Sequence, residues 1–265
     1  MGKQGEIEYV GRLTEAELRH AVNKPFSDSA CDVYPMELGA IMALLPPPPA
    51  HLLDVGCGTG WTSLFFARRG YQVLGIDIAP DMIEQAEALR QRGGVTGATF
   101  RVADYETVNF DVDFDCAVFF DSLHHAIDER LALRMVHQAL RPGGVCVTSE
   151  PGTGHAASDV ARTARETYSV TEKDMPPRHI VALAKEAGFS NFRTFPHAHQ
   201  VKWAVYSDQA GRLLGAWGRR FDCLRRLATV VSTANIRFRG EWDNAIVVMV
   251  KPQSCLSRPK SADAA

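Results

Sequence analysis

The feature that most constrains this chain is a strand-like run that ends in three glycines at alternate positions. Residues 51–60 read His-Leu-Leu-Asp-Val-Gly-Cys-Gly-Thr-Gly, and a helix-like segment follows over 61–69. A second apolar run over 72–76 ends in Asp77. Glycines let a ligand approach backbone N–H groups at a helix start, and an acidic residue after the next strand can accept hydrogen bonds from a ribose. The pattern therefore predicts a site for a cofactor that contains adenosine.

The spacing of these glycines distinguishes two kinds of adenosine cofactor. A dinucleotide site has the pattern G-x-G-x-x-G, whose third glycine, counted from Gly56, would fall on Trp61. The chain instead has G-x-G-x-G, through Gly58 and Gly60. The string Leu-Leu-Asp-Val-Gly-Cys-Gly-Thr-Gly resembles motif I of the class I S-adenosylmethionine-dependent methyltransferases. That cofactor carries a sulfonium and an amino-acid tail in place of a pyrophosphate. A tight turn that binds no ligand is the alternative for the glycines alone.

The resemblance extends in motif detail over residues 50–152, and it implies further contacts with S-adenosylmethionine. Asp77 would bind the ribose hydroxyls, and Ile78 would line the adenine. Asp104 would accept from the adenine amino group beside the Tyr105 N–H, although a turn carboxylate is the alternative for Asp104. The expected cofactor-binding set ends with two residues that close the fourth strand, and it comprises Asp54, Gly56, Cys57, Gly58, Gly60, Asp77, Ile78, Met82, Asp104, Tyr105, Phe120 and Asp121.

Strand-like and helix-like segments alternate along most of the chain. Apolar runs predict strands over 51–55, 72–76, 99–103, 115–120, 144–149, 191–197 and 245–251. Helices are predicted over 60–69, 80–92, 128–140, 157–168 and 177–187. Nearly continuous apolar strands are expected where both faces of a sheet are covered. The sequence therefore predicts a doubly wound α/β fold with a seven-stranded, mostly parallel sheet. The resemblance implies that the last strand inserts antiparallel between its two predecessors.

We divide the chain into an N-terminal helical cap, a Rossmann-like cofactor-binding core, a basic helical insert, a final core strand and a flexible tail. Their respective ranges are 1–49, 50–197, 198–244, 245–252 and 253–265. A helix cap is expected at Thr14. The insert contains eight basic and four acidic residues. We interpret it as a lid over an acidic or sugar-bearing acceptor, or as a covering helix with a solvated basic face. Contact with an anionic membrane surface is a third interpretation.

Composition excludes several other classes. A net charge of -2 over 265 residues argues against a nucleic-acid partner. No apolar run approaches the ~18 residues that a membrane span needs, and the first residues lack the apolar segment of a secretory signal. The six cysteines form no C-x-x-C pair, and Cys116 and Cys146 lie in strand-like runs. We therefore expect buried thiols and a cytoplasmic location. The sequence does not predict the oligomeric state.

Candidate catalytic residues follow the fourth and fifth strands, where doubly wound folds bind ligands. They are His124, His125, Glu150 and His155. Transfer of a methyl group to a hydroxyl benefits from a general base, and a histidine titrates in the useful range. Because His124 and His125 are adjacent, only one is expected to face the pocket. A structural part for this Leu-His-His string is the alternative. None of the histidines and carboxylates has the H-E-x-x-H spacing, so no metal site is expected.

The acceptor is predicted from resemblance alone. The strings over 121–126, 150–155 and 168–177 resemble a bacterial small-molecule methyltransferase subgroup that acts in surface-polysaccharide and glycoside pathways. This favours a small polar acceptor, sugar- or phosphate-bearing, methylated on a hydroxyl. A simple charged turn is the alternative for 171–174. Four rivals stay open, namely an N- or C-methyltransferase of a small metabolite, a macromolecule methyltransferase, a nicotinamide oxidoreductase and a non-catalytic cofactor-binding module.

Overall fold

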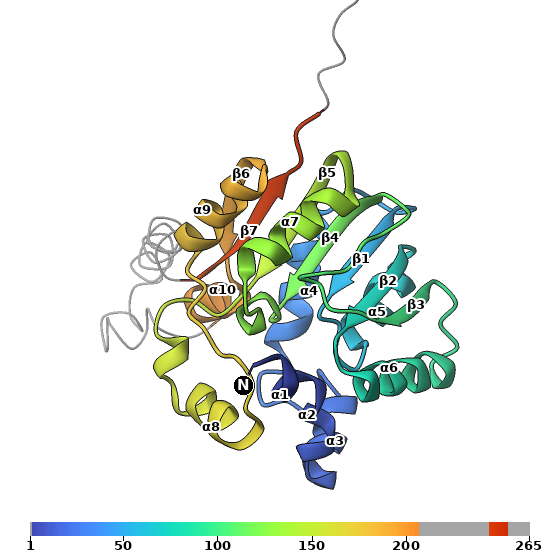
Figure 1. The fold of residues 1–265 in the computed structure, drawn as a ribbon, viewed down its shortest axis with the longest axis vertical. Coiled ribbons are helices and arrows are strands. Elements are labelled where there is room, and N and C mark those ends of the chain that lie inside the picture. The colour runs from blue at the N-terminus through green and yellow to red at the C-terminus, as the bar shows by residue number, and fades with distance from the viewer. Residues whose placement is uncertain (1, 207–243, 254–265) are drawn as a thin grey trace, which may run out of the picture.

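A computed structural model describes residues 2–206 and 244–253, and the structural statements below concern those residues. Its centre is a seven-stranded sheet in the order β3-β2-β1-β4-β5-β7-β6 (Figure 1). The strands are β1 (His51–Val55), β2 (Gln72–Asp77), β3 (Ala98–Val102), β4 (Phe114–Phe120), β5 (Leu140–Ser149), β6 (Ser190–Pro196) and β7 (Ala245–Val250). The first five are parallel, and β7 runs antiparallel to both β5 and β6. The predicted fold class, including the inserted last strand, is confirmed.

Helices cover both faces of this sheet and its carboxyl edge. They are α1 (Lys3–Ile7), α2 (Tyr9–Arg12), α3 (Glu15–Val22), α4 (Val33–Leu44), α5 (Trp61–Arg69), α6 (Pro80–Arg92), α7 (Glu129–Ala139), α8 (Asp159–Tyr168), α9 (Pro177–Ala187) and α10 (Ala198–Val201). Short turns of other helical types are η1 (Leu123–His125), η2 (His155–Ala157) and η3 (Lys202–Tyr206). Helices α7 and α9 lie on one face, and α4, α5 and α6 lie on the other.

Two apolar layers result from the alternation of side chains along each strand. On β1, Leu53 and Val55 pack toward α7 and α9, whereas Leu52 packs toward α4 and α5. All three side chains are fully buried. Each such burial contributes roughly 1.5–3 kcal/mol. The strand that leads into the glycine turn is therefore packed on both faces, and this packing fixes the position of the turn.

The beginning of β5 differs from the sequence prediction. The helix that was expected to reach 140 ends at Ala139, and the strand that was expected to start at 144 starts at Leu140. Leu140 pairs with Phe114 of β4, and the register shifts before the next pair. The glycine-rich run over 141–144 is thus a bulge within the strand, because it lies between two pairs with β4 while Gly143 and Gly144 pair with Lys251 after β7.

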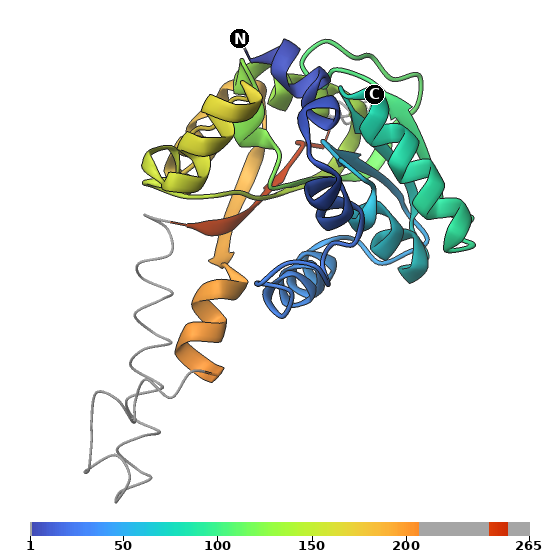
Figure 2. The same cartoon turned by 90° about the horizontal axis from the view of Figure 1, so that it is seen from below.

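The N-terminal helices lie over the carboxyl edge of the parallel strands, beside α8 (Figure 2). The Thr14 hydroxyl and the Glu17 carboxylate form the capping box that begins α3. The Tyr9 and Tyr168 rings meet edge to face with centroids 5.0 Å apart. The Arg12 guanidinium donates to the Tyr168 carbonyl oxygen at 2.9 Å. These contacts join α1–α3 to the end of α8, so the first residues of the chain form a wall of the region above the sheet.

The predictions for the cysteines fall on described residues, whereas those for the basic insert and the tail fall mostly outside them. Cys116 and Cys146 are buried, as expected. Of the basic insert, residues 207–243 lie outside the described residues, as does most of the expected tail. The division into domains stays a prediction. Within the described part of the chain, no helix combines the length and the apolar character that crossing a membrane requires.

Candidate active site

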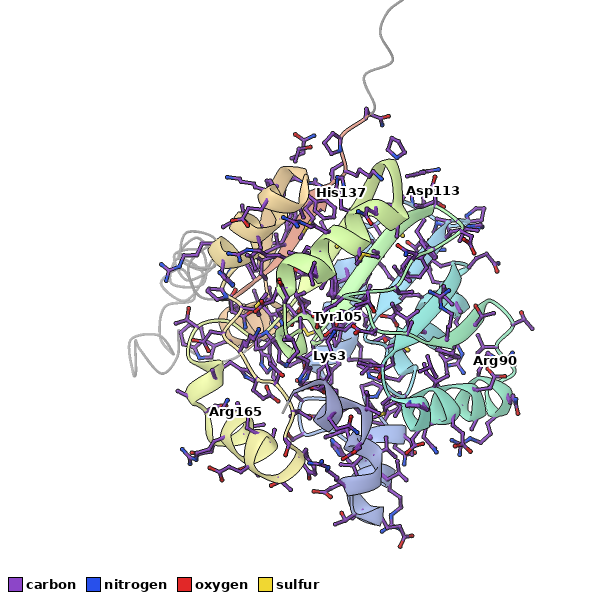
Figure 3. The ribbon with its side chains drawn as sticks, viewed as in Figure 1. Lys3, Arg90, Tyr105, Asp113, His137 and Arg165 are labelled. Carbon is purple, nitrogen blue, oxygen red and sulfur yellow. The ribbon has the colours of Figure 1, made fainter. Side chains whose placement is uncertain are left out.

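A cavity of about 700 Å³ opens at the carboxyl edge of the sheet, and a second of about 330 Å³ adjoins it. Gly56, Gly58 and Asp121 line both, so the two spaces meet around the glycine turn. Lys3 and Tyr105 both line the larger cavity and lie near the middle of the view in Figure 3, whereas His137 lies nearer its top. The larger volume lies in the range of small-molecule and cofactor pockets.

The glycine turn is closed by hydrogen bonds to the next strand. The N–H groups of Gly56 and Cys57 both donate to the Ile76 carbonyl oxygen at 2.9 Å. Gly56 has a φ of 72°, and a Cβ there would lie 2.6 Å from the Ser122 Cβ. Gly58 has a φ of 52°, but a Cβ there would enter open space. The first glycine is therefore required by packing against the turn after β4, and the second leaves the cavity open.

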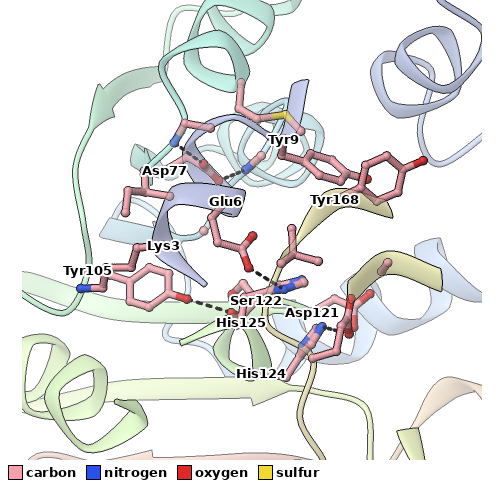
Figure 4. A pocket seen from close by; sticks show the side chains of 18 of the residues that line it. Lys3, Glu6, Tyr9, Asp77, Tyr105, Asp121, Ser122, His124, His125 and Tyr168 are labelled. Carbon is pink, nitrogen blue, oxygen red and sulfur yellow. Dashed lines mark hydrogen bonds and ion pairs between the residues drawn. The ribbon is translucent and has the colours of Figure 1, made fainter. Parts of the chain in front are cut away.

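Asp77 stands at the end of β2 and faces the larger cavity (Figure 4). Its carboxylate accepts the N–H groups of Gly58 and Ala79, each at 2.9 Å. Burial raises the pKa of this carboxyl, and the two N–H donors oppose that shift. Each carboxylate oxygen can accept more than one hydrogen bond, so Asp77 keeps acceptor capacity for a ribose diol.

Side chains suited to an adenine continue around the same wall. Ile78, Met82, Asp104 and Tyr105 line the cavity, as the sequence prediction placed them. Asp104 also has the role that was its alternative in the sequence, that of a turn carboxylate, because it accepts the N–H of residue 106 at 2.9 Å. The Lys3 ammonium lies 2.5 Å from the other oxygen of Asp104. Sequence reasoning missed Lys3, because nothing local connects it with a residue about a hundred positions away.

Two residues of the expected cofactor set do not line either cavity. The Asp54 carboxylate is buried beneath the turn, where it accepts the hydroxyls of Thr62 and Ser63 at 2.7 and 2.5 Å. Burial raises the pKa of Asp54 to about 6. At Gly60, a Cβ would lie 2.7 Å from both Ala86 and the Phe100 ring.

Both of these residues hold the turn in place from behind. Asp54 fixes the first turn of α5, and Gly60 lets α5 approach α6 and β3. Cys57 and Phe120, also expected, line the smaller cavity instead. Asp54 and Gly60 therefore shape the glycine turn from within the protein, whereas Cys57 and Phe120 border a cavity.

Glu150 organises the catalytic candidates without reaching the cavity. It is 2% exposed, and its carboxylate accepts the N–H groups of Ser122, Leu123 and His124 at 3.1, 2.8 and 3.2 Å. The same carboxylate accepts the His124 Nδ1–H at 2.8 Å. Glu150 therefore fixes η1 and the orientation of the His124 ring, and it has no access to an acceptor.

His124 and His125 both line the cavity, so the expectation that only one would face it is wrong. The short turn η1 lies across the cavity wall, and the two rings lean together with centroids 4.0 Å apart and planes tilted by 38°. The His125 Nδ1–H donates to the Thr171 carbonyl oxygen at 2.7 Å, and Nδ1 lies 3.4 Å from the Glu6 carboxylate. Burial alone would lower the pKa of His125, but the Glu6 carboxylate outweighs it and raises this pKa to about 9.

His155 and Glu172 complete the cluster from two further segments. The His155 Nε2 lies 2.6 Å from the Glu172 carboxylate, and the His124 Nε2 lies 3.5 Å from the same oxygen. The bond to Glu172 raises the pKa of His155. Burial would raise the pKa of Glu172, but its hydrogen bond to His155 and the histidine charges lower it.

Sequence reasoning missed two carboxylates of this cluster, Glu6 and Glu172. Glu172 lies in the charged string over 171–174 that was noticed but given no part. The neighbouring Asp174 accepts the N–H groups of Gly154 and Ala156 at 2.9 and 2.7 Å. That pairing brings the string against the loop after β5. The hydrogen bonds of Asp174 therefore hold this segment in a position where the Glu172 carboxylate contacts the histidines.

Comparisons with known proteins agree with this geometry. Residues 53–148 match the family model described as a methyltransferase domain. The O-methyltransferase cnsE of Penicillium expansum is 34% identical over 149 residues, which are 55% of this chain and 54% of that protein. The ubiquinone biosynthesis O-methyltransferase of Xanthomonas axonopodis pv. citri is 35% identical over 112 residues, 42% of this chain and 46% of that protein. The chain thus spans about half the length of these curated relatives.

A solved structure extends the comparison to the whole fold. Phosphoethanolamine N-methyltransferase 2 of Haemonchus contortus, in complex with S-adenosyl-L-methionine, superposes with a TM-score of 0.58 at 20% identity. The match covers 83% of this chain and 53% of that one. Residues 53–148 therefore form a methyltransferase domain, and the fold around it is that of the class I S-adenosylmethionine-dependent methyltransferases. S-adenosylmethionine is the cofactor of this class, and the residues around the glycine turn fit it.

Proposed function

We propose that this protein transfers a methyl group from S-adenosylmethionine to a hydroxyl of a small molecule. The observation that carries the proposal is a shared cavity, because Gly58 and Asp77 border the same space as His124 and His125. A cofactor held on the glycine turn would direct its methyl group toward the histidines. The relatives named as O-methyltransferases support oxygen as the acceptor atom.

The chemistry asks little of the protein beyond alignment and removal of a proton. The acceptor oxygen forms a bond to the methyl carbon as the carbon–sulfur bond breaks, and the electron pair stays on sulfur to give S-adenosylhomocysteine. The hydroxyl proton leaves through the histidine–carboxylate cluster. Proximity and orientation contribute most of the rate, and proton removal contributes about 10²–10⁴-fold.

The wall opposite the glycine turn favours an acceptor with polar and apolar parts. Helix α8 presents Val160, Thr163, Ala164 and Tyr168 to the cavity, and Lys24 borders it. A hydroxyl-bearing ring such as a glycoside suits this mixture, because its faces are apolar and its edges are polar. We therefore propose a glycoside or a related metabolite as the acceptor class.

The test is a product assay with an acceptor panel. The purified protein would be incubated with S-adenosylmethionine and separate glycosides, sugar phosphates, phenols and amines, and S-adenosylhomocysteine and the methylated product would be quantified by mass spectrometry. O-methylation of a glycoside by the wild type, with loss of turnover in His124→Ala, is the expected result. Methylation of amines alone would contradict the acceptor atom, and methylation of phenols alone would contradict the acceptor class. No turnover with any acceptor, in protein that binds S-adenosylmethionine, would favour a non-catalytic module.

A further inference from the structure

Three side chains of the histidine cluster converge with the spacing of metal ligands. One ring nitrogen each of His124 and His125 and one carboxylate oxygen of Glu172 all lie within 4.8 Å of one another. The His124 Nε2 and the Glu172 Oε2 are 3.5 Å apart. Two ligands that are each about 2.05 Å from a tetrahedral ion lie roughly 3.3 Å from one another. The observed separation is therefore close to that of two ligands on one ion.

The hydrogen bonds of the two rings leave the same nitrogen available on each. The Nδ1–H of His125 donates to the Thr171 carbonyl oxygen, which can only accept. The Nδ1–H of His124 donates to Glu150, whose two oxygens also accept three backbone N–H groups. In their neutral forms, both rings therefore carry the Nε2 lone pair. A carboxylate or carbonyl behind each imidazole is the usual arrangement around a bound metal ion.

The charge of the cluster is also suited to a cation. The carboxylates of Glu6, Glu150 and Glu172 converge on the histidines. Among residues 2–206 and 244–253, no lysine or arginine forms an ion pair with any of the three. Glu150 is buried and Glu6 and Glu172 are partly buried, and carboxylates removed from water need a compensating positive charge. In this part of the chain, only protons on the histidines or a bound cation supply it.

We propose that the Nε2 atoms of His124 and His125 and the carboxylate of Glu172 bind one divalent first-row transition-metal ion, with Zn²⁺ as the reference case. Two imidazoles and one carboxylate suit zinc, manganese, iron or cobalt better than magnesium, which prefers oxygen ligands. The His155 Nε2 lies 2.6 Å from the Glu172 oxygen that also faces His124, so its N–H would hold the ligating carboxylate in place by a hydrogen bond. Three protein ligands leave at least one position open, as in catalytic metal sites.

The open position would face the cavity, because both histidines line it. This role of the ion rests on the proposed function, whereas its binding does not. With both Nε2 atoms on the ion, an acceptor oxygen bound to it would lose its proton to solvent instead of to a histidine, and more readily because the metal stabilises the alkoxide. The alkoxide then forms the oxygen–carbon bond while the electron pair of the carbon–sulfur bond stays on sulfur. The ion keeps its oxidation state throughout.

The test is metal binding itself. Chelator-treated full-length protein would be titrated with Zn²⁺ by calorimetry and with Co²⁺ by visible absorption, which reports the ligand geometry. We expect one equivalent to bind, with at least about 100-fold weaker binding in His125→Ala and in Glu172→Ala. Glu150→Gln, which removes only the support behind His124, should weaken binding about 10–100-fold. Mg²⁺ should bind more weakly than either metal.

The control variant is His179→Ala, which removes an exposed imidazole on α9 and should bind Zn²⁺ like the wild type. S-adenosylmethionine titration of every sample checks that the variant is folded and tests the cofactor site separately. Equal Zn²⁺ binding by the wild type, His125→Ala and Glu172→Ala would overturn the proposal, as would no binding by the wild type. Either result could occur with the S-adenosylmethionine site intact, so the metal proposal can fail without the proposed function.

Discussion

The two halves of the cavity are built in different ways. On the cofactor side, the glycine turn and Asp77 belong to one β–α–β unit, and backbone N–H groups form most of the contacts that shape it. On the acceptor side, the functional groups are side chains. They come from η1, from the loops that follow β5 and α8, and from α1 at the other end of the chain.

The backbone fold therefore determines the cofactor side of the cavity, whereas individual side chains determine the acceptor side. The cofactor side can change little, because backbone hydrogen bonds shape the glycine turn and there is no room for a Cβ at Gly56 or Gly60. The acceptor side is assembled by hydrogen bonds between distant segments, so single substitutions can alter its chemistry without disturbing the sheet. Five substitutions, grouped in four tests, show whether the two sides of the cavity are separate.

The largest effect is expected from His124→Ala on the acceptor side. Turnover should fall about 10²–10⁴-fold, because the cluster loses its central imidazole. The Kd for S-adenosylmethionine should stay within about threefold of the wild-type value, since effects at separate sites are nearly independent. Steady-state kinetics and calorimetry measure the two quantities. A matching loss of cofactor affinity would show that the two sides act as one unit.

On the cofactor side, Gly56→Ala and Gly58→Ala form a matched pair. Both glycines have positive φ, so each substitution introduces strain of about 1 kcal/mol. Only at Gly56 would the new Cβ collide with Ser122, and overpacking adds about 1–3 kcal/mol. Urea unfolding should show the larger loss for Gly56→Ala. Equal losses would mean that the turn after β4 does not constrain the glycine turn.

A third test concerns the buried support of the glycine turn. The folded-state pKa of Asp54 is about 6, above its ordinary 3.8, so its contribution to stability is present below pH 4 and is lost as pH rises through 6. Burial is the main cause. Asp54→Asn removes this loss, and its stability relative to the wild type should improve by up to about 3 kcal/mol between pH 4 and pH 7. A pH-independent difference between the two proteins would contradict the assignment.

The smallest effect is expected from Lys3→Met, where α1 contacts the adenine wall. The Lys3 ammonium pairs with Asp104 and Glu106, but about a third of its side chain is exposed. Such pairs contribute about 0–1 kcal/mol, so the Kd for S-adenosylmethionine should change by less than about fivefold. Calorimetry measures this directly. A loss beyond tenfold would assign α1 to the cofactor side.

The sequence predicted the cofactor side better because its signal is local. Gly56, Gly58 and Asp77 lie within about twenty residues, and the spacing of the glycines differs from that of a dinucleotide site. The insertion of β7 between β5 and β6 followed from the family resemblance. Where the local motif failed, at Asp54 and Gly60, the residues serve the turn from behind, and spacing cannot tell which side of a strand meets a ligand.

The acceptor side resisted prediction because its contacts span long separations. Glu172 meets His124 from almost fifty positions away, and Glu6 reaches His125 from the first helix. No spacing rule connects such residues, which is also why no metal site was expected. Glu150 was identified as a candidate by its place after β5, but only the structure shows that three backbone N–H groups already occupy it. Most of the predicted basic insert over 198–244, for which a lid is one interpretation, lies outside the described residues.

Binding of S-adenosylmethionine at the glycine turn and Asp77 is tested most directly by calorimetry. The wild type and Asp77→Ala would each be titrated with S-adenosylmethionine, S-adenosylhomocysteine and reduced nicotinamide dinucleotide. The account predicts that both adenosyl ligands bind the wild type with a Kd below roughly 100 µM and that the dinucleotide does not bind. Loss of the charged hydrogen bonds to the ribose should weaken binding to Asp77→Ala at least about 100-fold. Folded wild-type protein that binds neither adenosyl ligand would contradict an S-adenosylmethionine site in this cavity. Asp77→Ala that binds both ligands as tightly as the wild type would contradict the role of Asp77.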